Sequence, residues 1–89
     1  RRLSTEAFTH QQKEALLYLQ EGQTRKGEQI DLFDLYDGRL HADHVVSVKD
    51  GGATEIWNGE LMFAEDNLVK GPQSNEPAFD FQRQDTDEG

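Results

Sequence analysis

The 89-residue chain contains no cysteine, and this absence excludes disulfides, thiolate-bound zinc and a cysteine nucleophile together. It fits a reducing compartment, so we expect a cytoplasmic protein. No segment approaches the roughly 18 consecutive apolar residues that a membrane span requires. A basic stretch followed by an apolar core, which marks a signal peptide, is also missing. Because the chain starts with Arg1 rather than Met, we expect a fragment of a longer protein.

Basic residues are scarce as well. The chain has 9 Lys and Arg against 18 Asp and Glu, which gives a formal net charge of −9. This excess of acids disfavours loose binding to nucleic acid, because phosphates are repelled, although it leaves room for a local site. Residues 73–89 hold five acids and one arginine, a net charge of −4, and leave −5 for residues 1–72. We expect a folded domain over residues 1–72 and an acidic tail over residues 73–89, which either packs through Phe79 and Phe81 or is disordered.

Hydrophobic patterning and turn residues predict a small α+β domain. Its first element is a helix over residues 9–20, with Thr9 as the N-cap, Phe8 stapling the start and Gly22 ending it. Strands are predicted over residues 30–36, 40–48 and 60–63. A short helix over residues 64–69 completes the domain.

An aspartate and a histidine stand side by side at Asp43 and His44, directly before two valines. Neighbouring side chains of a strand point to opposite faces, so one of them can hold a hard cation while the other faces the reacting water. Mg²⁺ prefers oxygen ligands, which the Asp43 carboxylate and the amide oxygen of Asn67 provide. An imidazole suits a general base, because its ordinary pKa is about 6.5.

The order and spacing of residues 40–71 resemble the HNH endonuclease family, which has the ββα-metal fold. That family's core reads Asp-His, a Gly-Gly loop, an Asn that opens the second strand, and a final His or Asn on a short helix. A Lys-Gly pair often follows three residues after this last residue. Here Asn58 follows His44 by fourteen residues. Asn67 comes nine residues later, and the Lys70-Gly71 pair begins three residues after that. Five elements therefore fall in order within one short segment.

The resemblance implies a metal-dependent endonuclease that hydrolyses DNA phosphodiester bonds, with Mg²⁺, Mn²⁺ or another divalent ion at Asp43 and Asn67. It also implies that His44 is the general base and that Asn58 ties down the loop bearing it. Lys70 is either a phosphate contact or a solvated lysine. With so acidic a chain, DNA affinity would come from a targeting domain or subunit elsewhere. Such a protein suits restriction or phage defence.

One departure from the family concerns structural zinc. Many members carry two Cys-x-x-Cys pairs, whereas residues 22–27 and 64–66 of this chain contain no cysteine. We therefore expect a zinc-free member without structural zinc. In such a member the first helix, together with Phe33, Leu35 and Tyr36, replaces the metal as core.

Several residues allow other interpretations. Asn58-Gly59 is also typical of a type I′ hairpin turn between two strands, and Asn67 could be a helix cap. His41 shares a strand face with Asp43; we expect it to be incidental, with a supporting or phosphate-binding role as the alternative. A surface location is expected for His10, and a core location for Trp57 and Phe63.

The net charge of −9 also supports a second function class. In this alternative the chain is a non-catalytic acidic interaction domain, either a degenerate nuclease fold or a DNA-mimicking inhibitor. Such a protein has no need for the nuclease residues in the family's register. Binding of a divalent ion at Asp43 and Asn67 separates the two interpretations.

Overall fold

A computed structural model describes residues 7–83, and the elements within that range have α+β architecture. The helices and strands are α1 (His10–Leu19), α2 (Leu32–Tyr36), β1 (Leu40–His44), β2 (Gly59–Phe63) and α3 (Ala64–Lys70). The connection between β1 and β2 contains two 3₁₀ turns, η2 (Val48–Asp50) and η3 (Ile56–Asn58), and a further one, η4 (Asp80–Gln82), follows α3. The predicted α+β class is confirmed. Within the described residues no helix is long and apolar enough to cross a membrane.

Helix α1 begins where the sequence predicts it. The Gln12 N–H donates to Thr9 Oγ1 at 3.1 Å, and the Thr9 N–H donates to Gln12 Oε1 at 2.8 Å. Two amides at the start of the helix are thereby satisfied reciprocally. At the other end, Glu21 and Gly22 adopt left-handed backbone, with φ angles of 55° and 71°, and the helix stops.

Helix α2 replaces the strand predicted over residues 30–36, and that prediction is wrong. The Asp34 N–H donates to Asp31 Oδ1 at 3.0 Å, and the Asp31 N–H donates to Asp34 Oδ2 at 3.1 Å. This reciprocal cap satisfies amides that a helix start otherwise leaves unpaired. Local capping therefore outweighs the imperfect alternation of apolar side chains.

Strands β1 and β2 pair antiparallel, with Asp43 opposite Glu60 and His44 opposite Gly59. β1 ends at His44, earlier than the predicted residue 48, because its partner strand begins only at Gly59. The amide of the next residue, Val45, donates to the carbonyl of Asn58 in η3, the turn before β2, and not to a strand. The strand and helix predicted next match β2 and α3 within one residue at each end.

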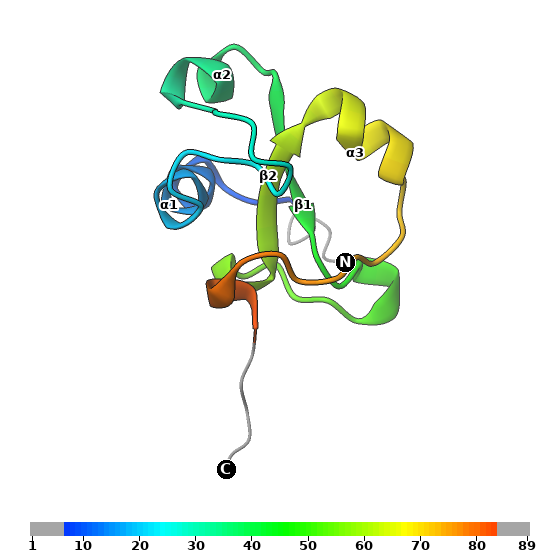
Figure 1. The fold of residues 1–89 in the computed structure, drawn as a ribbon. Coiled ribbons are helices and arrows are strands. Elements are labelled where there is room, and N and C mark those ends of the chain that lie inside the picture. Colours follow the sequence, from blue (N-terminus) through cyan, green and yellow to red (C-terminus); the bar gives the residue numbers. More distant parts are fainter. Residues whose placement is uncertain (1–6, 84–89) are drawn as a thin grey trace.

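The sheet separates two layers of helices: α1 and α2 lie on one side and α3 lies on the other (Figure 1). The core fills the α1–α2 side and consists of Leu16, Ile30, Leu35, Leu40 and Leu61. Phe63 packs against this cluster in partly buried form. Phe33, Tyr36 and Trp57 are 77%, 58% and 38% exposed, so the prediction that they belong to the core is wrong. The short helix α2 turns only Leu35 inward, which leaves its aromatic residues at the surface.

Buried glutamine side chains satisfy the outer edge of β2. The Leu61 N–H donates to Gln20 Oε1 at 2.7 Å, and the Leu61 carbonyl accepts from Gln20 Nε2 at 3.2 Å. Gln82 Nε2 donates to the Gly59 carbonyl at 2.9 Å. A two-stranded sheet leaves one edge of each strand unpaired, and here side chains take the place of a third strand.

Residues 73–83 pack against the rest of the fold. In Figure 1 this orange segment runs from the end of α3 past the end of the sheet, and η4 comes to lie beside η3. The Asn75 N–H donates to the Val45 carbonyl at 2.7 Å. The Phe79 and Phe81 rings are stacked with centroids 5.8 Å apart, and Phe81 packs against the core. The remainder of the predicted tail lies outside the described residues.

Candidate active site

A cavity of about 510 Å³ opens where β1 ends, between the following loop and the end of α3. Its lining residues are Asp43, His44, Ser47, Val48, Lys49, Lys70 and Pro72. Three of the five residues predicted for the site, Asp43, His44 and Lys70, therefore meet in one cavity. Asn58 and Asn67 do not line it, although each contacts a segment that forms its wall.

Asp43 forms an ion pair with Lys70. Asp43 Oδ2 lies 2.7 Å from Lys70 Nζ, and the two side chains are 16% and 11% exposed. Lys70 also donates to the Gln73 carbonyl. The ammonium thus balances the carboxylate that the sequence predicts as a metal ligand. A metal ion at Asp43 has to compete with it.

A second carboxylate lies beside Asp43 on the same sheet face. Glu60, its cross-strand neighbour, is 1% exposed and accepts hydrogen bonds from Arg25 Nε at 2.7 Å and Nη2 at 2.6 Å. The hydrogen bonds to Glu60 raise the pKa of Arg25, burial lowers it by less, and the charges of Glu60 and Asp43 raise it further. Each of the two carboxylates on this face is therefore paired with a base: Asp43 with Lys70 and Glu60 with Arg25. Charges that are shielded from water require such partners.

His44 lies half-buried between Thr54 and Phe8. Its Nε2 lies 2.8 Å from Thr54 Oγ1, and its ring lies against the Phe8 ring with centroids 4.6 Å apart. Phe8, expected to staple the start of α1, is thus buried beside this histidine. Gly59, which lies opposite His44, leaves space for the Phe8 ring, because a Cβ at this position would lie 2.9 Å from that ring. These contacts fix the imidazole orientation, which a general base needs.

The Asn58 side chain is buried and binds the loop that follows His44. Its Oδ1 accepts from the Val46 N–H at 2.9 Å, and its Nδ2 donates to the carbonyls of Val46 and Ala53 at 3.0 and 2.9 Å. The alternative of a type I′ hairpin turn is wrong, because Asn58 ends η3 and Gly59 has extended backbone with φ of −112°. Asn58 positions the loop and does not reach the cavity.

The Gly51-Gly52 pair in this loop has two separate steric causes. Gly51 has a φ of 93°, a left-handed conformation that side chains disfavour. Gly52 passes so close to the backbone that a Cβ would lie 1.7 Å from the Val46 carbonyl oxygen. That Cβ would also lie 2.9 Å from Asn58 Nδ2. The glycines therefore let the loop fold around the asparagine.

Asn67 lies in α3 one turn before Lys70 and contacts β1 at His41. Asn67 Nδ2 and His41 Nδ1 are 3.0 Å apart, so the amide meets the histidine that was expected to be incidental. The helix-cap alternative for Asn67 is wrong, because the N-cap of α3 is Phe63. Two successive contacts therefore join β1 to α3: His41 with Asn67, and Asp43 with Lys70.

This face offers two oxygen donors, in Asp43 and Asn67, for the divalent cation that the sequence predicts. The Asp43 carboxylate and the Asn67 amide come from facing elements, and Mg²⁺ is commonly held by one or two carboxylates together with several waters. Within residues 7–83 no group of three or more His, Cys, Asp or Glu side chains is placed to hold a metal ion. A metal at Asp43 and Asn67 would therefore take most of its ligands from water or substrate.

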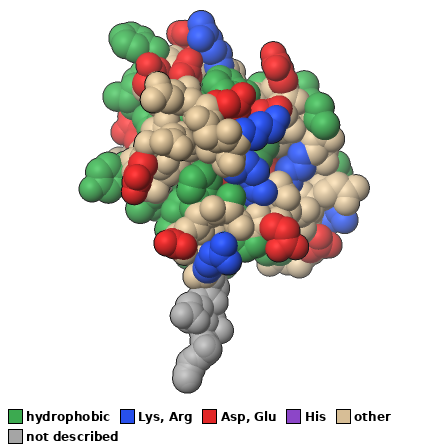
Figure 2. All heavy atoms as spheres, in the orientation of Figure 1, with side chains coloured by type: hydrophobic (Ala, Val, Ile, Leu, Met, Phe, Trp, Pro, Cys, Tyr) green, Lys and Arg blue, Asp and Glu red, His purple; other side chains and the backbone are tan. Residues whose placement is uncertain are grey.

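The cations around the cavity are already paired with acids. Lys49 lies 3.7 Å from Asp50. Lys26, which lines a second pocket together with Lys70, lies 2.9 Å from Asp66. Figure 2 shows Lys and Arg side chains gathered near the centre of one face, over the region of β1 and α3, with acidic side chains among them. A DNA phosphate at this face has to compete with carboxylates for each cation.

Two contacts of the site have no signal in the sequence. Thr54 lies ten residues from His44, and Arg25 lies thirty-five residues from Glu60. Neither residue type stands in a motif, so only the folded chain reveals that Thr54 contacts His44 and that Arg25 contacts the buried Glu60.

Comparison of the chain with protein-family models, with curated proteins and with solved structures finds no match. The functional argument therefore rests on the residues of the site and on their geometry.

Proposed function

We propose that this chain is the cleavage domain of a metal-dependent DNA endonuclease with the ββα-metal fold of the HNH family. The observation that carries the proposal is the convergence of Asp43, His44 and Lys70 on one cavity. Two further features support it. The chain order is β1, loop, β2 and α3, with α3 against the sheet, and Asn58 binds the loop between the strands.

In the proposed reaction, His44 accepts a proton from the water that attacks the phosphorus. Thr54 holds the imidazole in orientation for this step. Asp43 and Asn67 are the residues that would hold Mg²⁺ or Mn²⁺, which when bound supplies Lewis-acid stabilisation of charge on the phosphate and the leaving oxygen. The Lys70 ammonium binds the substrate phosphate after its ion pair with Asp43 has broken. The products carry 5′-phosphate and 3′-hydroxyl ends.

The charge distribution supports DNA targeting by another domain or subunit. The net charge is −9, and the cations at the cavity are paired with acids. Few phosphate contacts are therefore open to this domain, and its own DNA affinity is low and sensitive to salt. A cleavage module directed by a separate targeting module suits restriction or phage defence.

Plasmid nicking with Mg²⁺ or Mn²⁺, in the presence and absence of EDTA, tests the proposal. We expect slow nicking at low salt that disappears with EDTA and in the Asp43→Ala variant. Asp80→Ala is the matched control, because it removes the same charge from a side chain that is fully exposed to water. Nicking that persists in EDTA or in Asp43→Ala contradicts the proposal.

The Lys70–Asp43 ion pair favours one other candidate, a non-catalytic acidic interaction domain, because an ammonium already balances the carboxylate. A melting experiment with divalent ions separates the two candidates. If the chain is a nuclease, Mg²⁺ or Mn²⁺ raises the melting temperature and Asp43→Ala abolishes the rise. A melting curve that millimolar ions leave unchanged, together with an absence of nicking by the folded chain, favours the interaction domain.

A further inference from the structure

We infer that the cleft between α1 and α2 is a docking site for a basic protein segment that inserts apolar side chains. The cleft has a volume of about 730 Å³. It lies on the α1–α2 side of the sheet, away from α3 (Figure 1). Its buried wall includes Ile30, and the neighbouring Leu17 is half-buried. The site is therefore separate from the cavity at Asp43.

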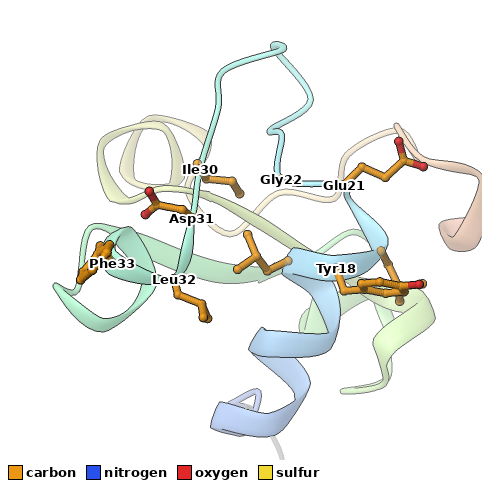
Figure 3. Close-up of a pocket in the computed structure, with 9 residues that line it drawn as sticks. Tyr18, Glu21, Gly22, Ile30, Asp31, Leu32 and Phe33 are labelled. Atoms are coloured by element: carbon orange, nitrogen blue, oxygen red, sulfur yellow. The ribbon is translucent and has the colours of Figure 1, made fainter.

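The side chains along this cleft are apolar and largely open to water. Tyr18 is 82% exposed and Phe33 is 77% exposed, and Leu19 and Leu32 are also accessible. Figure 3 places Phe33 and Tyr18 at opposite ends of the cleft, with Leu32 between them. Scattered exposed apolar residues are ordinary, whereas several along one hollow are typical of an interaction site. Aromatic residues are also enriched where proteins bind one another.

The charges on the rim indicate the chemistry of the partner. Glu21 and Asp31 line the cleft, and no Lys or Arg does. The carboxylates of both residues flank the apolar floor at its two ends (Figure 3). No ion pair among residues 7–83 involves either of them. A segment with Lys or Arg beside apolar anchors complements both the floor and the rim.

The net charge of the whole chain argues against other occupants of the cleft. The net charge of −9 repels a second copy of this chain, a nucleic acid and an anionic membrane alike. A basic segment is attracted by both the rim and the whole molecule. The occupant that fits is therefore a protein segment that combines basic and apolar residues.

The test titrates the ¹⁵N-labelled chain with a short amphipathic peptide of Leu and Lys, and in parallel with the same peptide carrying Glu in place of Lys. We expect amide shifts in residues 17–33 with the Lys peptide, and about tenfold weaker binding of the Glu peptide. Phe33→Ser should weaken binding of the Lys peptide about fivefold or more. Leu68→Ser is the matched control, because Leu68 is also 77% exposed but lies on α3, and it should have no effect.

A second variant isolates the charge of the rim. Glu21 has the left-handed φ of 55°, which asparagine adopts readily, so Glu21→Asn keeps the backbone and removes the carboxylate. We expect weaker binding of the Lys peptide, by a factor that shrinks as salt is added, with an unchanged or higher melting temperature. The inference is overturned if the Lys peptide does not bind, if both peptides bind equally, or if Leu68→Ser weakens binding as much as Phe33→Ser. Dimerisation of the free chain through the same amides would assign the cleft to a second copy and also overturn it.

Discussion

The Lys70 ammonium lies 2.7 Å from the Asp43 carboxylate, with both side chains largely shielded from water. Lys70 ends α3 and Asp43 belongs to β1, so the pair ties the helix to the sheet. When an ion pair has little access to water, removal of one partner leaves the other charge buried and uncompensated, which destabilises the fold. Under the proposed function, the same contact competes with a metal at Asp43. Stability of the metal-free fold and the proposed affinity for a metal then oppose each other at this residue.

The first prediction concerns this competition. In Lys70→Ala we expect the affinity for Mn²⁺ to rise about fivefold, or ~1 kcal/mol, because the competing ammonium is gone. DNA cleavage and the melting temperature of the metal-free protein should both fall. Calorimetric titration with Mn²⁺ measures the affinity. Lys49→Ala is the control: Lys49 lines the same cavity but lies 3.7 Å from Asp50 and leaves Asp43 paired. Weaker Mn²⁺ binding by Lys70→Ala would contradict the competition.

The second prediction assigns the general base. His44→Ala should lower cleavage about 10²–10⁴-fold while Mn²⁺ affinity stays close to that of the wild type. Because the His44 ring packs against Phe8, His44→Gln is a second variant that preserves more of the packing. Thr54→Val removes the hydroxyl beside His44 Nε2 and should cost about tenfold, less than removal of the base itself. Wild-type turnover in either His44 variant rules out this assignment.

The elements that the sequence predicts correctly are those with local signals. Helix α1 has Thr9 and Gln12 in capping register, and its start follows from these neighbours alone. Helix α2 carries two local signals that conflict: an alternating apolar pattern and the Asp31–Asp34 cap. In the structure the cap is formed, and the helix leaves Phe33 exposed.

The candidate site also has parts that the sequence shows and parts that it does not. The sequence shows the adjacent Asp43 and His44, which line the cavity, and the Gly51-Gly52 pair, whose small size the loop requires. The partner of Asp43 is not visible, because Lys70 lies twenty-seven residues away and reaches it only through the packing of α3. Of the five residues that the sequence predicts for the site, Asp43, His44 and Lys70 line one cavity, whereas Asn58 and Asn67 do not. The partners of these side chains depend on tertiary structure.

The third prediction concerns acid stability. Hydrogen bonds from the hydroxyls of Ser74 at 2.6 Å and Ser47 at 3.1 Å lower the pKa of Asp50, and the charge of Lys49 lowers it further. A lowered pKa in the folded state means that the ionised carboxylate stabilises the fold. This contribution is complete above the unfolded value of about 3.9 and is lost as pH falls through the folded pKa. In urea unfolding, the advantage of the wild type over Asp50→Asn should be constant near neutral pH and shrink in acid. If the advantage of the wild type grows on acidification, the prediction that the folded state lowers the pKa of Asp50 is wrong.

The fourth prediction compares the two glycines of the cavity loop. Gly52→Ala should cost about 2–4 kcal/mol of unfolding free energy, because its Cβ would meet the Val46 carbonyl and the loop must shift. Gly51→Ala should cost only about 1 kcal/mol, since no atom lies within 4 Å and only the left-handed φ is unfavourable. Denaturant unfolding of both variants measures the difference. Equal costs would show that the close approach to Val46 is not maintained in solution.

The fifth prediction concerns the segment after α3, where charge and packing lead to opposite expectations. A chain that ends at Pro72 loses acidic residues that repel DNA, which by itself raises cleavage at low salt. It also loses the hydrogen bonds of Asn75 to Val45 and of Gln82 to Gly59. Each buried backbone group left unpaired costs about 1–3 kcal/mol. In so small a domain we expect packing to prevail, so the truncated chain should melt at a lower temperature and lose activity.

Two single substitutions separate these causes without truncation. Gln82→Ala removes the buried amide and should lower the unfolding free energy by about 1–3 kcal/mol. Asp80→Ala removes one negative charge from the same segment at a fully exposed side chain, and should change neither stability nor cleavage. Melting and plasmid nicking on both variants measure the two effects. If repulsion of DNA dominates instead, Asp80→Ala raises nicking at low salt and the chain ending at Pro72 gains activity without losing stability. That result would mean that residues 73–83 lower DNA cleavage through their negative charge. The buried Gln82 and the stacked rings of Phe79 and Phe81 favour a structural role instead.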